Sequence, residues 1–139
     1  FGDDYLDTIN DRLVLLAQIE STEGLAAVDA ILAVPGLSGI LVGPEDLSRA
    51  LGVPRARLFA AHDGTLAGLA QRARARGRCS SIWVRDLGEA ARAIACGFDL
   101  VGLYPSAWVV RQQAKAGVEA FRAMADGRDA AQSQRGAGV

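Results

Sequence analysis

The chain has 139 residues, of which half are hydrophobic and 22% are charged, a composition typical of one globular domain. Its formal net charge of −1 argues against nucleic acid or an anionic membrane surface as a partner. No stretch approaches the roughly 18 consecutive apolar residues of a membrane-spanning helix, and no signal-peptide pattern opens the chain. Cys79 and Cys96 lie in apolar contexts without metal-ligand spacing, which favours buried thiols and a cytoplasmic location.

In chain order, short apolar runs alternate with segments of helical periodicity, and glycine or proline commonly ends an element. Residues 4–10 are typical of the end of a helix, and Ser21 or Thr22 is the expected N-cap of the next helix. The predicted strands are 13–19, 38–42, 79–84 and 99–104. The predicted helices that follow them are 24–33, 46–51, 58–76, 88–96 and 106–124.

These four β/α units predict a parallel sheet, because the strands are too apolar to leave a face in water. Either a doubly wound sheet or part of a (β/α)₈ barrel satisfies the pattern, although a complete barrel needs about 250 residues and eight units. The opening helix has no strand before it, and the only methionine is Met124, so we expect a piece of a longer protein. Residues 1–125 form the predicted domain, and 126–139, without periodicity, the predicted disordered tail.

Two carboxylates follow neighbouring predicted strands. Glu20 comes directly after the run that ends at Ile19, and Asp46 comes after the Gly43-Pro44 turn. Because parallel strands joined by a helix end at the same edge of a sheet, these carboxylates form a candidate hard-oxygen site for a divalent cation. The alternative is that each carboxylate only stabilises the start of a helix.

The motifs around these carboxylates resemble the HpcH/HpaI aldolase and citrate lyase β-subunit family. The resemblance rests on Gln18-Ile19-Glu20, followed by Gly24, and on Gly43-Pro44-Glu45-Asp46-Leu47-Ser48. It runs from about residue 5 to 124 and is strongest over 14–52. The family includes 2,4-dihydroxyhept-2-ene-1,7-dioate and 2-dehydro-3-deoxyglucarate aldolases. The resemblance implies a (β/α)₈ TIM barrel of the phosphoenolpyruvate/pyruvate superfamily, of which this chain supplies the C-terminal four β/α units.

The resemblance also implies a reaction and a site. Family members cleave a 4-hydroxy-2-oxo acid to pyruvate and an aldehyde, and a divalent metal (Mg²⁺, Mn²⁺ or Co²⁺) holds the enolate charge. Glu20 and Asp46 match the metal ligands. The substrate-binding positions match Gln18, Gly43, Pro44, Glu45 and Asp46, with backbone N–H groups at Glu45 and Asp46 holding the substrate carboxylate.

Several residues depart from the family pattern. The catalytic His and the Arg of the family belong to the first half of the barrel, so this chain holds no catalytic residue, and His62 matches no catalytic position. Glu45 stands where the aldolases usually have a small residue. The citrate lyase branch tolerates a glutamate at this position. Ser106 stands where relatives often have Asp. Arg85, just past a strand, is expected to form a solvated ion pair.

Two alternatives to the aldolase stay open. One is a lyase acting on a coenzyme A thioester, and the other is an inactive half-barrel that serves as a binding or scaffold remnant. The fragment alone is expected to be inactive. Half a barrel exposes two sheet edges, so we also expect self-association or a homo-oligomer.

Overall fold

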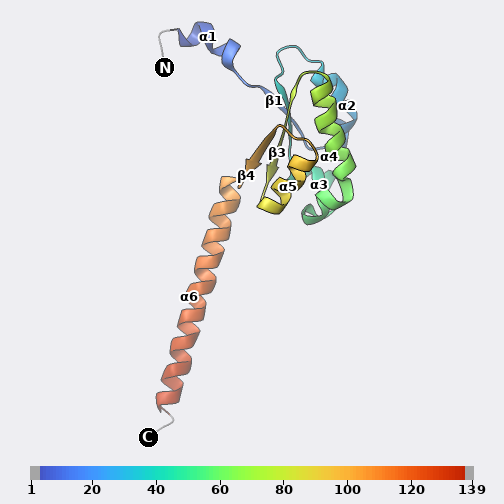
Figure 1. Cartoon of the computed structure of the whole chain (residues 1–139). Coiled ribbons are helices and arrows are strands. Elements are labelled where there is room, and N and C mark those ends of the chain that lie inside the picture. The colour runs from blue at the N-terminus through green and yellow to red at the C-terminus, as the bar shows by residue number, and fades with distance from the viewer. Residues whose placement is uncertain (1–3, 137–139) are drawn as a thin grey trace. The chain divides into compact units, whose positions relative to one another are not determined.

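The computed structural model describes the backbone of residues 4–136 and the side chains of 4–125. Four parallel strands alternate with helices along the chain (Figure 1). The strands are β1 (Leu16–Ile19), β2 (Gly39–Val42), β3 (Cys79–Val84) and β4 (Leu100–Leu103). The helices are α1 (Tyr5–Arg12), α2 (Thr22–Leu32), α3 (Pro44–Ala50), the 3₁₀ turn η1 (Arg55–Arg57), α4 (Leu58–Ala75), α5 (Leu87–Ala95) and α6 (Ser106–Gly136).

The strand order identifies the architecture. The sheet runs β1-β2-β3-β4, and every neighbouring pair is parallel. A doubly wound sheet would reverse its strand order partway across, and this one does not. Sequential parallel strands that are each followed by a helix are part of a (β/α)₈ barrel, which confirms the predicted fold class. Within the described residues, β1 and β4 form the two edges.

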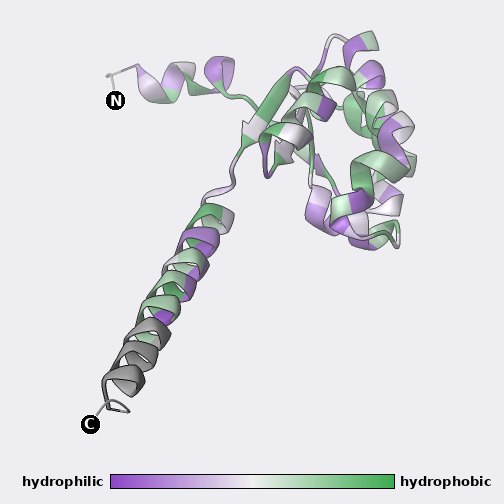
Figure 2. Cartoon of the chain, turned by 60° about the horizontal axis from the view of Figure 1, so that its bottom comes forward, coloured by the Kyte–Doolittle hydropathy of each residue, from purple (hydrophilic) through white to green (hydrophobic). Residues whose placement is uncertain are grey.

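One face of the sheet carries the hydrophobic core. Ile19, Val42 and Ile82 form one cross-strand row in the register of β1, β2 and β3, and all three are fully buried. They pack with buried residues of α2 and α4, such as Val28 and Leu66. The strands are among the most hydrophobic parts of this unit in Figure 2. The adjacent row points to the other face, and it includes the exposed Gln18.

Local signals explain where several elements begin and end. Ser21, one of the two predicted caps, accepts the N–H of Gly24 at 3.0 Å and starts α2. The strand predicted over 13–19 begins only at Leu16, because its first partner on β2 is Gly39. α4 bends at His62, whose backbone is not helical, and ends before Gly77, which has a positive φ of 64°.

The chain divides into two compact units, Phe1–Leu103 and Tyr104–Val139, rather than at the predicted boundary after residue 125. The second unit contains α6, which continues to Gly136 and therefore replaces predicted disorder over 126–136 with helix. This segment has no apolar periodicity, and it mixes alanine, arginine and glutamine, which favour helix, with equal numbers of aspartate and glycine, which do not. The final residues, 137–139, lie outside the described residues. None of the described helices has the length and hydropathy of a membrane span.

Asp99 fastens the segment before β4 to β3. Its Oδ2 accepts the Ser80 N–H at 2.9 Å and the Ser80 hydroxyl at 2.8 Å, and Arg74 lies 3.3 Å from its Oδ1. The hydrogen bond from the Ser80 N–H, aided by the Ser80 hydroxyl and Arg74, lowers the pKa of Asp99 below its ordinary value. The folded state therefore prefers the carboxylate.

Asp99→Asn is expected to destabilise the chain at pH 7 and to matter less in acid. Because the folded pKa is the lower one, the carboxylate contributes its stability above the unfolded value, about 3.9. That stability is lost as pH falls through the folded value. Urea unfolding at pH 7 and pH 3 should show a smaller difference between parent and variant at pH 3. An unchanged difference would contradict this assignment, and Asp29→Asn, an exposed carboxylate on α2, is the control.

Candidate metal and substrate site

Gln18, Glu20 and Gly43 meet where β1 and β2 end. Gln18 Nε2 donates to Glu20 Oε2 at 2.5 Å, and the Gly43 N–H donates to the Ile19 carbonyl at 3.0 Å. A Cβ placed on Gly43 would lie 2.8 Å from both Gln18 Nε2 and Glu20 Oε2. Only glycine lets the ends of the Gln18 and Glu20 side chains lie this close to the backbone at position 43.

A proline and two hydrogen bonds shape the turn after Gly43. Pro44 is buried at the first position of α3, and the Leu47 N–H donates to the Gly43 carbonyl at 2.9 Å. The Ser48 hydroxyl donates to the Glu45 carbonyl at 2.8 Å. N–H groups in the first turn of a helix have no acceptor within that helix. The N–H groups of Glu45 and Asp46 are therefore among those that can donate hydrogen bonds to an anionic group.

Asp46 lies in the same turn with an exposed carboxylate. The side chain is 55% exposed, and its Oδ1 pairs with Arg49 at 2.5 Å. Among the described residues, no three His, Cys, Asp or Glu side chains are grouped to hold a metal. Glu20 and Asp46 nevertheless supply two oxygen ligands of the kind that hard divalent cations take, with water and a bound acid able to fill other positions.

Glu45 is held by two arginines from other segments. Its carboxylate forms an ion pair with Arg85, which follows β3, and lies 3.5 Å from Nε of Arg55 in η1. The predicted ion pair of Arg85 is thus confirmed, with Glu45 as its partner. Arg55 and Glu89 were not predicted from the sequence. Glu89 follows the N-cap Asp86 by three residues, which is the spacing of a capping box. No local pattern marks Arg55.

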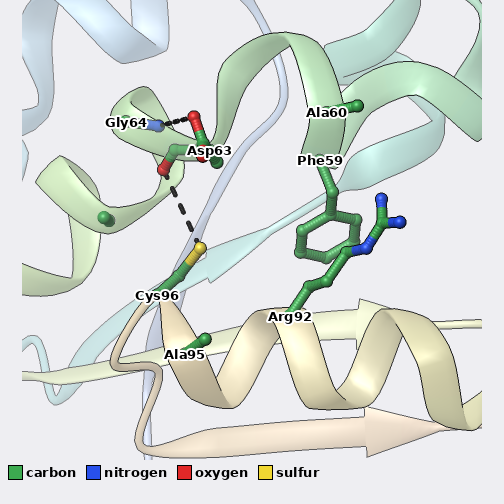
Figure 3. Close-up of a pocket in the computed structure, with 8 residues that line it drawn as sticks. Phe59, Ala60, Asp63, Gly64, Arg92, Ala95 and Cys96 are labelled. Carbon is green, nitrogen blue, oxygen red and sulfur yellow. Dashed lines mark hydrogen bonds between the residues drawn. The ribbon is translucent and has the colours of Figure 1, made fainter.

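A separate cavity of about 450 Å³ lies between α4 and α5 (Figure 3). None of the predicted site residues lines it. Cys96 Sγ lies 3.8 Å from the Asp63 carbonyl, and burial raises the pKa of the Cys96 thiol, which disfavours a reactive thiolate. His62, half-buried at the bend of α4, does not line it. The lining residues are Phe59, Ala60, Asp63, Gly64, Ala67, Arg92, Ala95 and Cys96.

Gly43→Ala is expected to weaken Mn²⁺ binding about tenfold with little loss of stability. The new methyl group would displace the ends of Gln18 and Glu20, which are flexible, and press on Glu20 Cβ at 3.1 Å. Isothermal titration and a thermal melt on the same samples measure the two effects. Equal Mn²⁺ affinity in variant and parent would show that this space is not part of a metal site. Gly64→Ala, with no neighbour within 4 Å of the new Cβ, is the matched control.

Comparisons with known proteins identify the family. A sequence profile of the HpcH/HpaI aldolase/citrate lyase family matches residues 5–104. The 2-keto-3-deoxy-L-rhamnonate aldolase of Klebsiella pneumoniae is 34% identical over 101 residues, which are 73% of this chain and 38% of that protein. The counterpart in Salmonella newport gives the same values. The match therefore spans well under half the length of these curated relatives.

Solved structures agree with this assignment. An HpcH/HpaI aldolase/citrate lyase family protein from Burkholderia cenocepacia is 26% identical with a TM-score of 0.66, and the match covers 86% of this chain and 47% of that one. A citrate lyase β subunit from M. tuberculosis, complexed with oxaloacetate and magnesium, is 24% identical with a TM-score of 0.52. That match covers 68% of this chain and 48% of the other and supports the fold. The chain belongs to the HpcH/HpaI aldolase/citrate lyase family.

Proposed function

We propose that the protein carrying this chain catalyses the reversible, metal-dependent aldol cleavage of a 4-hydroxy-2-oxo acid to pyruvate and an aldehyde. The observation that carries the proposal is the contact of Gln18 and Glu20 with Gly43, with Asp46 in the adjoining turn. Membership of an aldolase and lyase family supports the reaction type. The matched relatives named as aldolases support a 2-oxo acid as substrate.

The chain's own residues divide the proposed work. Glu20 and Asp46 would hold a divalent cation (Mg²⁺, Mn²⁺ or Co²⁺), which supplies stabilisation of the negative charge that develops on the 2-oxo group. The N–H groups of Glu45 and Asp46 bind and orient the carboxylate of the acid. The Gln18 amide donates a hydrogen bond to Glu20 and so orients the Glu20 carboxylate. Pro44 fixes the backbone of the turn.

A coupled assay with lactate dehydrogenase tests the reaction. The protein that contains this chain should release pyruvate from a 4-hydroxy-2-oxo acid, lose this activity with a chelator and regain it with Mn²⁺. Release that a chelator leaves unchanged would refute the proposal. The 139-residue chain by itself is expected to release none, because the family resemblance places the catalytic His and Arg in the first half of the barrel.

A lyase acting on a coenzyme A thioester is the second candidate. Glu45, in place of a small residue, and the fold shared with the citrate lyase β subunit favour it. The same protein should then cleave a 3-hydroxyacyl-coenzyme A thioester that carries a carboxylate faster than it cleaves the corresponding acid without coenzyme A. If it cleaves neither substrate and binds no Mn²⁺, the remaining interpretation is a binding or scaffold remnant.

Self-association is expected for this chain. β1 and β4 are edge strands, and apolar side chains at these edges are exposed, including Leu15 and Leu100. An unpaired edge offers N–H and C=O groups to another chain. Sedimentation velocity should therefore show species larger than a monomer. A monodisperse monomer with a cooperative thermal transition would contradict this expectation.

A further inference from the structure

Four charged side chains from three segments form one connected network beside the candidate site. Glu45 is in α3 and Arg55 is in η1. The third segment supplies Arg85, directly after β3, and Glu89, in the first turn of α5. Arg55 forms two parallel hydrogen bonds to Glu89, of 2.7 Å and 2.8 Å. The Arg85 N–H donates to the same carboxylate at 2.9 Å, while the Arg85 guanidinium pairs with Glu45. The network contains two cations and two anions and is neutral.

The buried part of this network is aimed at Glu45. The Arg55 side chain is only 9% exposed, and its Nε makes no hydrogen bond to the described side chains or backbone. Glu45 Oε1 lies 3.5 Å from Nε. An arginine fork held on a carboxylate at both terminal nitrogens cannot turn without breaking two charged hydrogen bonds. Arg55 therefore holds a fixed positive edge toward Glu45.

The network explains how Glu45 fits in this turn. Its carboxylate would repel both the metal-binding carboxylate next to it, Asp46, and the carboxylate of an acid substrate. Arg85 and Arg55 neutralise this charge and hold the side chain toward β3 and η1. The same contacts restrain the backbone at Glu45, which also carries the hydrogen bond from Ser48.

We infer that Glu45 and Arg85 form a latch that positions the Gly43–Asp46 turn for binding metal and acid, and that the largely buried Arg55–Glu89 ion pair supports this latch. Glu45 and Arg85 are positioning residues in this inference, and the inference rests on the proposed function of the turn. Position and charge predict opposite signs for the two substitutions. If charge alone mattered, Glu45→Gln would improve binding of an anion and weaken binding of a cation, and Arg85→Gln would do the reverse.

The experiment measures the binding of two ligands to the parent and three variants of the full chain. Mn²⁺ binding, and pyruvate binding to the Mn²⁺-loaded chain, are titrated for the parent, Glu45→Gln, Arg85→Gln and the double variant. Arg76→Gln, which removes an ion pair to Asp29 on the helical side, is the matched control. Glu45 and Arg85 are 48% and 27% exposed, so these variants avoid the unfolding expected when the buried Arg55 or Glu89 is changed. Amide hydrogen exchange across residues 43–47 is measured in parallel, without metal.

Each single substitution is expected to lower the affinity for both ligands about fivefold. The double variant is expected to bind both ligands no more weakly than either single variant. Exchange across 43–47 should quicken in all three variants and not in the control. Opposite signs for the two ligands, or exchange unchanged from the parent, would overturn the latch. If the folded parent binds neither ligand, this chain alone does not form the proposed metal and acid site, and the exchange data still decide whether the latch orders the turn.

Discussion

Asp46→Ala is expected to reduce Mn²⁺ binding by about 100-fold or more while leaving the fold intact. Asp46 supplies one of only two proposed protein ligands, and loss of even an outer partner of a metal ligand costs about 10- to 100-fold. Its ion pair with Arg49 is exposed on both sides, so removing it costs little stability. Electron paramagnetic resonance of free Mn²⁺ measures the binding, and circular dichroism checks that both proteins are folded.

The control for Asp46→Ala is a carboxylate of similar exposure in another place. Asp29 on α2 forms an ion pair with Arg76 at 2.9 Å, and Asp29→Ala should bind Mn²⁺ as the parent does. Glu20→Gln tests the second proposed ligand, because it removes the charge and keeps the shape of the side chain beside Gly43. Parent-like binding by Asp46→Ala would show that Asp46 is only a helix-terminal carboxylate. A folded parent without Mn²⁺ binding would refute a metal site built from these two carboxylates alone.

Much of the fold could be predicted because apolar runs bounded by glycine and proline mark the strands directly. All four strands lie within the predicted ranges. The first strand was predicted to be too long, since Leu13, Val14 and Leu15 are as apolar as the paired residues that follow. Only the register against Gly39 determines where pairing begins, and that register is a long-range property. The length of α6 escaped prediction because its end has no apolar periodicity and mixes residues that favour helix with glycine and aspartate.

The candidate site could be predicted only where its parts are close in sequence or joined by one β/α unit. Gln18 and Glu20 are two residues apart, and the helix between β1 and β2 brings Gly43 to them. The arginines around Glu45 come from segments 10 and 40 residues farther along the chain. Nothing in a local pattern specifies which arginine reaches a given carboxylate. The unusual residue in the turn, Glu45, therefore has its explanation in tertiary structure.

Gly39→Ala is expected to destabilise the first unit by about 3 kcal/mol, a large part of the stability of an ordinary domain. Gly39 is buried at the start of β2, directly opposite Cys79 in the register of β2 and β3. A Cβ there would collide with the Cys79 carbonyl oxygen and lie 2.7 Å from its carbon. These are backbone atoms and cannot rotate away, so the two central strands would have to separate. Urea unfolding followed by circular dichroism measures the loss.

Gly68→Ala is the matched control, and it should shift stability in the opposite direction. Gly68 lies within α4, and a Cβ there meets nothing within 4 Å. Alanine in a helix interior is favoured over glycine by about 0.8–1.0 kcal/mol. Both substitutions add the same methyl group and restrict the unfolded chain alike, so their difference isolates the contact between β2 and β3. If Gly39→Ala unfolds at the same urea concentration as Gly68→Ala, the close approach of these strands does not limit the residue at position 39.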